Sequence, residues 1–196
     1  MMHGPAKTLD PHAEALVLAY IVANRPRTAR RDRVAVLLSW RAGLRVCEIA
    51  RLCWADVTDA SGTLADTIRI RRETTKGKTF TRFVPMHGDL KAALLRLAGN
   101  TMVDPRRPLL LGRSKQAFSV NALTVFFHRL YADTGLDGCS SHSGRRTFIT
   151  RTARRCTDVG ASIEDVRLMA GHAYLSTTAG YIDPNQDAKH KLVALI

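Results

Sequence analysis

The sequence predicts a mainly helical domain with a small antiparallel β-sheet, which is an α+β fold. Apolar residues recur at helical spacing through most of the 196 residues. Only the stretch between residues 67 and 84 shows the alternating pattern that is typical of strands. Hydrophobic residues make up 45% of the chain, which is enough for a core at this length without disulfide or metal support.

Three helices are predicted before the sheet. The first contains the apolar run of residues 15–23, and the second extends from about residue 28 to residue 42. The third is indicated by apolar residues at the i, i+3, i+4, i+7 spacing of one helix face: Val46, Ile49, Ala50 and Cys53.

The sheet is predicted as a hairpin. Residues 67–71 read T-I-R-I-R, the alternation of a half-buried strand, and residues 80–84 form a second β-rich run. The glycine-containing stretch 75–78 joins them as a turn.

Helical spacing returns after the sheet at residues 90–98 and 123–131. Residues 162–165 resemble a capping box that opens a further helix, and Gly171 is the residue that ends it in a left-handed conformation. His172 is therefore expected just beyond a helix end. Asp183 and Pro184 are typical of the start of a last helix over residues 184–195.

The charge of the chain favours a polyanionic partner. Thirty Lys and Arg residues oppose 17 Asp and Glu residues, a net charge of +13. Basic side chains near phosphates release counterions on binding, so nucleic acid is the favoured partner. A solvated basic surface and a membrane surface are the alternatives, although no basic amphipathic anchor helix is present. The four cysteines form no C-x-x-C pair, so we expect neither a disulfide framework nor a metal site.

Four segments carry residues that are capable of chemistry: 42–49 (A-G-L-R-V-C-E-I), 76–85, 142–145 (H-S-G-R) and 170–181. Taken singly, each has an ordinary explanation. Arg45 beside Glu48 is most often a surface ion pair, and Tyr181 is most often a core aromatic residue.

Taken together, the segments resemble the tyrosine recombinases, the lambda-integrase-like or Xer-like family. The order is that of the family over residues 28–190: G-L-R-x-x-E, a hairpin lysine, H-x-x-R, G-H and a tyrosine. The resemblance implies the integrase catalytic core fold and cleavage and rejoining of double-stranded DNA. It also implies a 3′-phosphotyrosine intermediate that needs no metal, ATP or other cofactor.

The resemblance also implies the roles of the catalytic residues. Arg45 and Arg145 correspond to the arginines that clamp the scissile phosphate, whose oxygens match guanidinium forks. Lys76, with Lys78 as a possible substitute, corresponds to the lysine that protonates the leaving 5′ oxygen. His142 and His172 complete the pocket, and Tyr181 corresponds to the nucleophile. Fixed positive charge stabilises the charge that develops in the transition state.

Several further expectations concern organisation and partners. Residues 1–27 are expected to form an N-terminal arm and first helix, and residues 28–196 a catalytic domain with its C-terminal helix. The separate core-binding domain of most family members is absent. The chain therefore resembles either an excised domain or a short recombinase of the fimbrial inversion type.

We expect a homo-tetramer on DNA in the cytoplasm, associated with the nucleoid, in the setting of a mobile element, a phage or a phase switch. The last helix, residues 184–195, docks either on a neighbouring protomer or on its own core. Two other functions stay open: a type IB-like topoisomerase and a catalytically silent DNA-binding module. Basic residues outside the pocket are predicted to contact DNA: Arg69, Arg71, Lys78, Arg113, Lys115 and Arg146.

The chain departs from the family pattern at two places. Family members often read H-x-L-R-H, whereas Gly144 and Arg146 occupy the third and fifth positions here. We expect local repacking, or an additional phosphate contact, at these positions. Residues 154–160 also form a connection that is longer than usual for the family.

Overall fold

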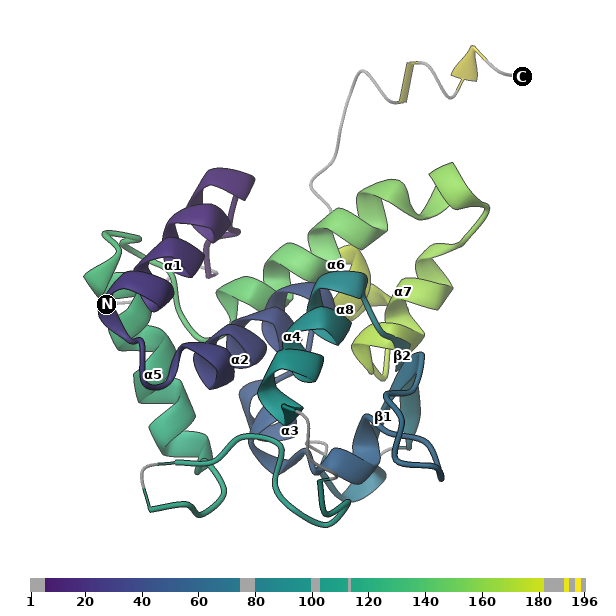
Figure 1. Ribbon diagram of the computed structural model, residues 1–196. Helices are drawn as coiled ribbons and strands as arrows, with labels where there is room; N and C mark the ends of the chain where they lie inside the picture. Colours follow the sequence, from purple (N-terminus) through teal and green to yellow (C-terminus); the bar gives the residue numbers. More distant parts are fainter. Residues whose placement is uncertain are drawn as a thin grey trace.

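The computed structural model describes residues 6–74, 80–99, 103–112, 114–181, 189–190 and 193–194. It confirms the predicted mainly helical fold with a two-stranded antiparallel sheet (Figure 1). The elements before and within the sheet are α1 (Pro11–Asn24), α2 (Ala29–Arg41), α3 (Val46–Arg51), β1 (Thr67–Ile70) and β2 (Arg82–Pro85). After the sheet come α4 (Gly88–Ala98), α5 (Val120–Asp133), α6 (Ser143–Arg155), α7 (Ile163–Ala170) and α8 (Leu175–Ala179).

Helix α2 is the centre of the main core. Every residue from position 34 to position 40 is buried, so this helix is enclosed nearly all round. It packs against α1, α3, α4 and α6. In Figure 1, α1 and α5 lie on one side of α2, and α7, α8 and the sheet lie on the other.

The sheet brings an arginine into the interior. In the register of β1 and β2, Ile68 lies opposite Val84 and Ile70 lies opposite Arg82, and all four side chains are buried. The predicted strands are therefore confirmed, with ends shifted by one or two residues. Arg82 is only 5% exposed, and an arginine is rarely buried unless it is paired.

The third predicted helix is shorter than its apolar spacing indicated. Helix α3 ends at Arg51, and Leu52 is already extended, so including Cys53 in the helix was wrong. Cys53 instead forms a β-bridge with Pro108, and the Trp54 amide donates to the carbonyl of Arg107. Pairing with a distant segment overrides the helical period at this point.

Helix α1 is attached firmly to the rest of the structure. Its Asp10 cap accepts a hydrogen bond from the Ala13 amide at 2.7 Å, and Val17 and Ile21 are part of the main core. The buried Glu14 forms ion pairs with Arg41 at 2.8 Å and Arg151 at 2.6 Å, which join α1 to α2 and α6. Among the helices of the described ranges, none has an apolar stretch of the length that a membrane crossing requires.

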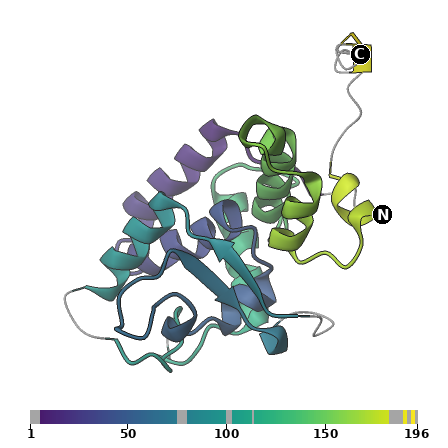
Figure 2. The same ribbon diagram turned by 90° about the vertical axis from the view of Figure 1, so that its right-hand side faces the viewer.

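A second, smaller core lies between α6 and α7, at one corner of the molecule in Figure 2. Its buried members are Phe148, Ile149, Cys156, Val166 and Ala170, and Tyr181 packs against them. The long connection of residues 154–160 contains the end of α6 and a short 3₁₀ turn, Cys156–Val159, which stops at Gly160 with a φ of 72°. The chain thus reverses and begins α7.

Candidate active site

The first arginine lies at the start of α3. Gly43 has a φ of +64°, and a β-carbon at this position would collide with the ring of Phe148, so the turn before α3 requires glycine. The amide of Arg45 donates to Glu48 Oε2 at 2.9 Å, and its guanidinium donates to Glu48 Oε1 at 3.1 Å. A further bond reaches the Gly171 carbonyl at 3.3 Å. Arg45 is therefore fixed by α3 and by the end of α7.

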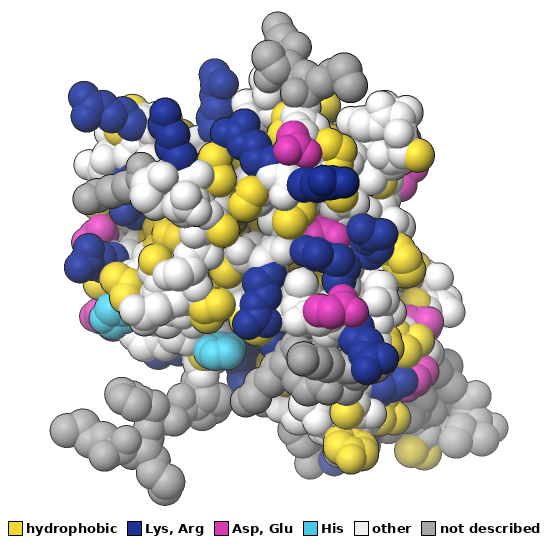
Figure 3. Space-filling view, turned by 90° about the horizontal axis from the view of Figure 1, so that it is seen from below, with side chains coloured by type: hydrophobic (Ala, Val, Ile, Leu, Met, Phe, Trp, Pro, Cys, Tyr) yellow, Lys and Arg dark blue, Asp and Glu magenta, His cyan; other side chains and the backbone are white. Residues whose placement is uncertain are grey.

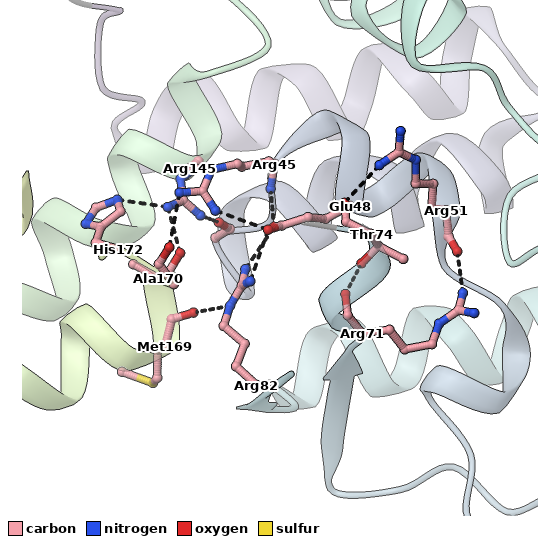
Figure 4. A network of polar contacts seen from close by, with 12 residues as sticks. Arg45, Glu48, Arg51, Arg71, Thr74, Arg82, Arg145, Met169, Ala170 and His172 are labelled. Carbon is pink, nitrogen blue, oxygen red and sulfur yellow. Dashed lines mark hydrogen bonds and ion pairs between the residues drawn. The ribbon is translucent and has the colours of Figure 1, made fainter. Parts of the chain in front are cut away.

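Glu48 and Arg82 form a buried two-point ion pair beneath Arg45 (Figure 4). Arg82 donates to Oε1 of Glu48 at 3.0 Å and to Oε2 at 2.8 Å, and its Nε donates to the Met169 carbonyl at 3.0 Å. Burial alone would raise the pKa of Glu48. The hydrogen bonds and charges of Arg82 and Arg45 outweigh burial and lower that pKa below its ordinary value. The carboxylate therefore stays charged and joins β2 to α3.

The second arginine projects from the first turn of α6 into the interior. Arg145 is 3% exposed and donates to the carbonyl of Gly43, to the Ala170 carbonyl at 2.7 Å and to His172 Nε2 at 2.9 Å. Burial, followed by the charge of Arg45, lowers the pKa of Arg145 to about 10, so the guanidinium is charged at neutral pH.

Gly144 allows α6 to approach α2 closely. A β-carbon at Gly144 would collide with the side chains of Ser39 and Trp40. The departure from H-x-L-R is thus explained by a close contact between two helices, which agrees with the expected local repacking.

His172 is neutral, with one tautomer favoured by its partners. Because Arg145 can only donate, Nε2 of His172 must accept, and Nδ1 then donates to Thr178 Oγ1 at 2.9 Å. Burial, followed by the charges of Arg145 and Arg45, lowers the pKa of His172 to about 4 from its ordinary 6.5. Both ring nitrogens are occupied, so His172 fits a positioning role better than proton transfer.

Gly171 directly precedes His172 and lies against the side chains of Arg45 and Arg82. It has a φ of +65° and ends α7 in the left-handed conformation, as the sequence predicted. A β-carbon there would also collide with the guanidinium of Arg82. The Ser162–Asp165 capping box at the other end of α7 is confirmed as well, with Ser162 Oγ accepting from the Asp165 amide at 3.4 Å.

Tyr181 lies against His172. Their rings are stacked, with centroids 5.6 Å apart and an interplanar angle of 25°. The Tyr181 carbonyl accepts a hydrogen bond from Thr150 Oγ1 at 3.2 Å, and the guanidinium carbon of Arg146 lies 5.5 Å from the ring centroid. Contacts thus link Tyr181 through His172 to Arg145.

His142 directly precedes α6, and its side chain is exposed. Partial burial, then the charges of Arg145 and Arg45, lower its pKa. The neutral imidazole therefore dominates at pH 7, which suits a group that accepts a proton.

The structure brings five of the six predicted catalytic residues into one region: Arg45, His142, Arg145, His172 and Tyr181. Lys76 lies outside the described residues, as do Lys78 and Arg113 from the predicted DNA contacts. The sequence placed Arg82 in the chemistry-bearing segment 76–85 but gave it no role, and it missed Thr150 and the partnership of Thr178 with His172. The structure shows that Arg82 lies opposite the buried Ile70 and points into the interior.

Some of the remaining residues that were predicted to contact DNA already form ion pairs within the chain, and others are exposed. Asp56, which is 2% exposed, pairs with Arg71 at 3.0 Å and with Arg69 at 3.5 Å. These two arginines therefore help to hold β1 against the turn after α3. Lys115 is exposed in a tight turn with a φ of 59°. Figure 3 shows one face of the molecule, on which Lys and Arg side chains lie in several groups with acidic side chains between them. DNA contact at these positions stays a prediction.

Two arginines, two histidines and a tyrosine lie together on a mainly helical domain, and this arrangement is typical of the tyrosine recombinase class. The model of the Phage integrase family matches residues 12–188, and the chain belongs to this family of tyrosine recombinases. Tyrosine recombinase XerD of Xanthomonas axonopodis pv. citri (strain 306) is 31% identical over 164 residues. That match covers 77% of this chain and 50% of the relative, so the chain spans about half the length of the curated relative that it matches.

Solved structures share the fold at lower identity. The Tn1549 transposon integrase in complex with a circular intermediate DNA superimposes with a TM-score of 0.71 and 19% identity. This match covers 98% of this chain and 67% of that one. The XerH site-specific recombinase, bound to its difH substrate in a pre-cleavage complex, gives a TM-score of 0.72 and 19% identity. It covers 96% of this chain and 53% of that one.

Proposed function

We propose that this chain is the catalytic domain of a site-specific DNA recombinase, which cleaves and rejoins one strand through Tyr181. The observation that carries the proposal is the chain of contacts from Tyr181 through His172 to the buried Arg145, with Arg45 beside it. Double-stranded DNA is the substrate, as the net charge of +13 also favours. Its biological setting is integration, excision or inversion of a DNA segment.

The arginines would bind the scissile phosphate. Arg45 has a side chain that is 24% exposed, so its free N–H groups are available to a phosphate oxygen, while Glu48 keeps the guanidinium in place. Arg145 is charged and lies directly behind. Both cations are fixed before DNA binds, so they stabilise developing negative charge without reorganisation.

The cleavage step balances as a transesterification. The Tyr181 hydroxyl oxygen forms a bond to phosphorus while the bond from phosphorus to the 5′ oxygen breaks. Neutral His142 accepts the phenolic proton, and Lys76 supplies a proton to the leaving 5′ oxygen. The products are a 3′-phosphotyrosine and a 5′ hydroxyl, and the reverse attack by a 5′ hydroxyl rejoins the strand.

The assembly belongs to the same proposal. Two DNA sites are brought together by four protomers, with the protein associated with the nucleoid. Residues 184–195, which lie largely outside the described residues and are predicted from the sequence to form a last helix, dock on a neighbouring protomer in this proposal. The XerH and Tn1549 complexes with DNA support double-stranded DNA as the partner, by similarity of fold.

A suicide-substrate assay tests the proposal. Nicked duplexes from the DNA that flanks the gene are mixed with the purified chain and with Tyr181→Phe, then separated on a denaturing gel. We expect a slow protein–DNA band with the native chain, unaffected by chelator, and no band with Tyr181→Phe, whose DNA affinity is retained.

Other outcomes separate the alternative functions. Binding without any covalent band argues for a catalytically silent DNA-binding module. Relaxation of supercoiled plasmid of any sequence, through a Tyr181 adduct, argues for a type IB-like topoisomerase. A covalent band that persists with Tyr181→Phe would show that another residue is the nucleophile.

A further inference from the structure

Arg146 is the one departure from the family pattern that the pocket chemistry leaves unexplained. It follows Arg145 on α6, where family members often carry a histidine. Its guanidinium has no carboxylate or hydrogen-bond partner among the described residues, and its side chain is half-buried. The side chain does have one clear neighbour, the ring of Tyr181 at 5.5 Å.

Two successive turns of α6 hold the tyrosine. Arg146 and Thr150 are four residues apart, so they lie on the same face of the helix. Arg146 lies over the Tyr181 ring, and Thr150 donates to the Tyr181 carbonyl at 3.2 Å. The His172 ring stacks on the same phenol with centroids 5.6 Å apart. Ring and backbone of Tyr181 are thus fixed from α6 and from the end of α7.

We propose that Arg146 is a positioning residue for the nucleophile: its guanidinium holds the Tyr181 ring through a cation–π contact and keeps a positive charge over that ring. This inference rests on the proposed function of Tyr181. A guanidinium over an aromatic face is attracted by the ring quadrupole, and the attraction grows where water is excluded. The same positive charge stabilises the bound nucleophile in the transition state of the attack on phosphorus.

The role differs from the phosphate contact that the sequence suggested for Arg146. A phosphate contact acts on DNA affinity and its dependence on salt. A contact with the nucleophile acts on the rate constant of cleavage once DNA is bound. The two roles are therefore separable by measuring affinity and rate on the same variants.

The first experiment compares Arg146→Gln, Arg146→Lys and the native chain on the suicide substrate at saturating DNA. We expect Arg146→Gln to lower the rate constant of covalent adduct formation about tenfold, with DNA affinity within about twofold of native. Arg146→Lys keeps a cation that can lie over the ring, so it should recover most of the rate. Arg155→Gln is the matched control, because Arg155 lies on the same helix but is paired with Asp158 at the surface.

A result of the opposite kind overturns the proposal. If Arg146→Gln keeps the native rate at saturation but weakens binding and reduces the salt slope by about one, Arg146 is a phosphate contact. Equal losses for Arg146→Gln and Arg146→Lys would also reject a role of the positive charge.

A second readout does not depend on cleavage. The chain has four tyrosines, so it can be labelled with 3-fluorotyrosine and the Tyr181 fluorine signal assigned with Tyr181→Phe. Arg146→Gln should move the Tyr181 signal in the absence of DNA, whereas Arg155→Gln should leave it in place. An unmoved signal in Arg146→Gln rejects the contact. If the native chain forms no adduct but Arg146→Gln still moves the Tyr181 signal, the proposed function is rejected while the contact between Arg146 and Tyr181 is supported.

Discussion

The two halves of the pocket are built in different ways. The arginine half, formed by α3, β2 and the first turn of α6, contains a buried carboxylate, two-point ion pairs and bonds to backbone carbonyls. The tyrosine half depends on the small core between α6 and α7, two ring contacts and single hydroxyl bonds. The site for the phosphate is thus preorganised by strong, buried electrostatics, whereas the nucleophile is held by individually weaker contacts.

The largest effect is expected from breaking the electrostatic half. Glu48→Gln leaves the buried guanidinium of Arg82 without its counter-charge, which costs about 3–5 kcal/mol for a buried pair. Urea unfolding measures this loss. Glu164→Gln is the matched control, because Glu164 makes a two-point pair with Arg167 at the surface, where solvent screens the charges and a much smaller loss is expected. Equal losses in the two variants would contradict the preorganised character of the arginine half.

A second variant separates catalysis from DNA binding. Arg145→Ala removes a charged donor behind the phosphate, so we expect adduct formation to fall about 100- to 1000-fold while DNA affinity falls much less. Arg71→Ala provides the comparison, because Arg71 pairs with Asp56 and is predicted to contact DNA only outside the pocket. It should weaken binding and leave the rate at saturation near the native value. Comparable losses of affinity and rate in Arg145→Ala would mean that Arg145 merely holds DNA.

The smallest expected effect concerns pH and the tyrosine half. Because the pKa of His172 is lowered to about 4 in the folded chain, only the unfolded chain takes up its proton as pH falls from about 6.5 toward 4. Stability should therefore decrease in this window, by roughly 1–2 kcal/mol between pH 7 and pH 5. Thermal unfolding at a series of pH values measures the slope.

His142 contributes to that slope in the same direction, since its pKa is also lowered. The measurement is therefore repeated in His142→Gln, in which the contribution of His142 to the pH dependence of stability is removed and that of His172 remains. A flat profile in His142→Gln would show that His172 titrates normally and that its buried contacts with Arg145 and Thr178 do not hold in solution.

The sequence predicted which residues lie together in the pocket better than it predicted the scaffold that holds them. Arg45, His172 and Tyr181 were identifiable because motif order and helix-end signals such as Gly171 are local features. Helix α6 was not delimited, because its sequence S-G-R-R-T-F-I-T-R-T-A-R-R has few apolar residues to reveal a period. Its helical form is supported by distant partners, such as Glu14 for Arg151.

Arg82 illustrates the same limit. A charged residue in a strand normally points to solvent, and nothing in the local sequence indicates that Arg82 pairs with Glu48 in the interior. The partnership depends on the register of β1 with β2 and on how α3 packs beside the sheet. It could be found only from the assembled fold.

The close contact of Gly144 with Trp40 has a consequence for how such domains diverge. The space beside α6 at position 144 is filled by the side chains of Ser39 and Trp40 on the neighbouring helix, so these positions share one fixed volume. Position 144 cannot then change by itself: a leucine at 144 has no space unless Trp40 is replaced by a smaller residue and the Ser39 side chain also gives way. A smaller residue at position 40 leaves a void until position 144 carries a larger one. The two sites form a compensating pair, so substitutions at them should arise together in related chains and should be exchanged together in chimeric recombinases.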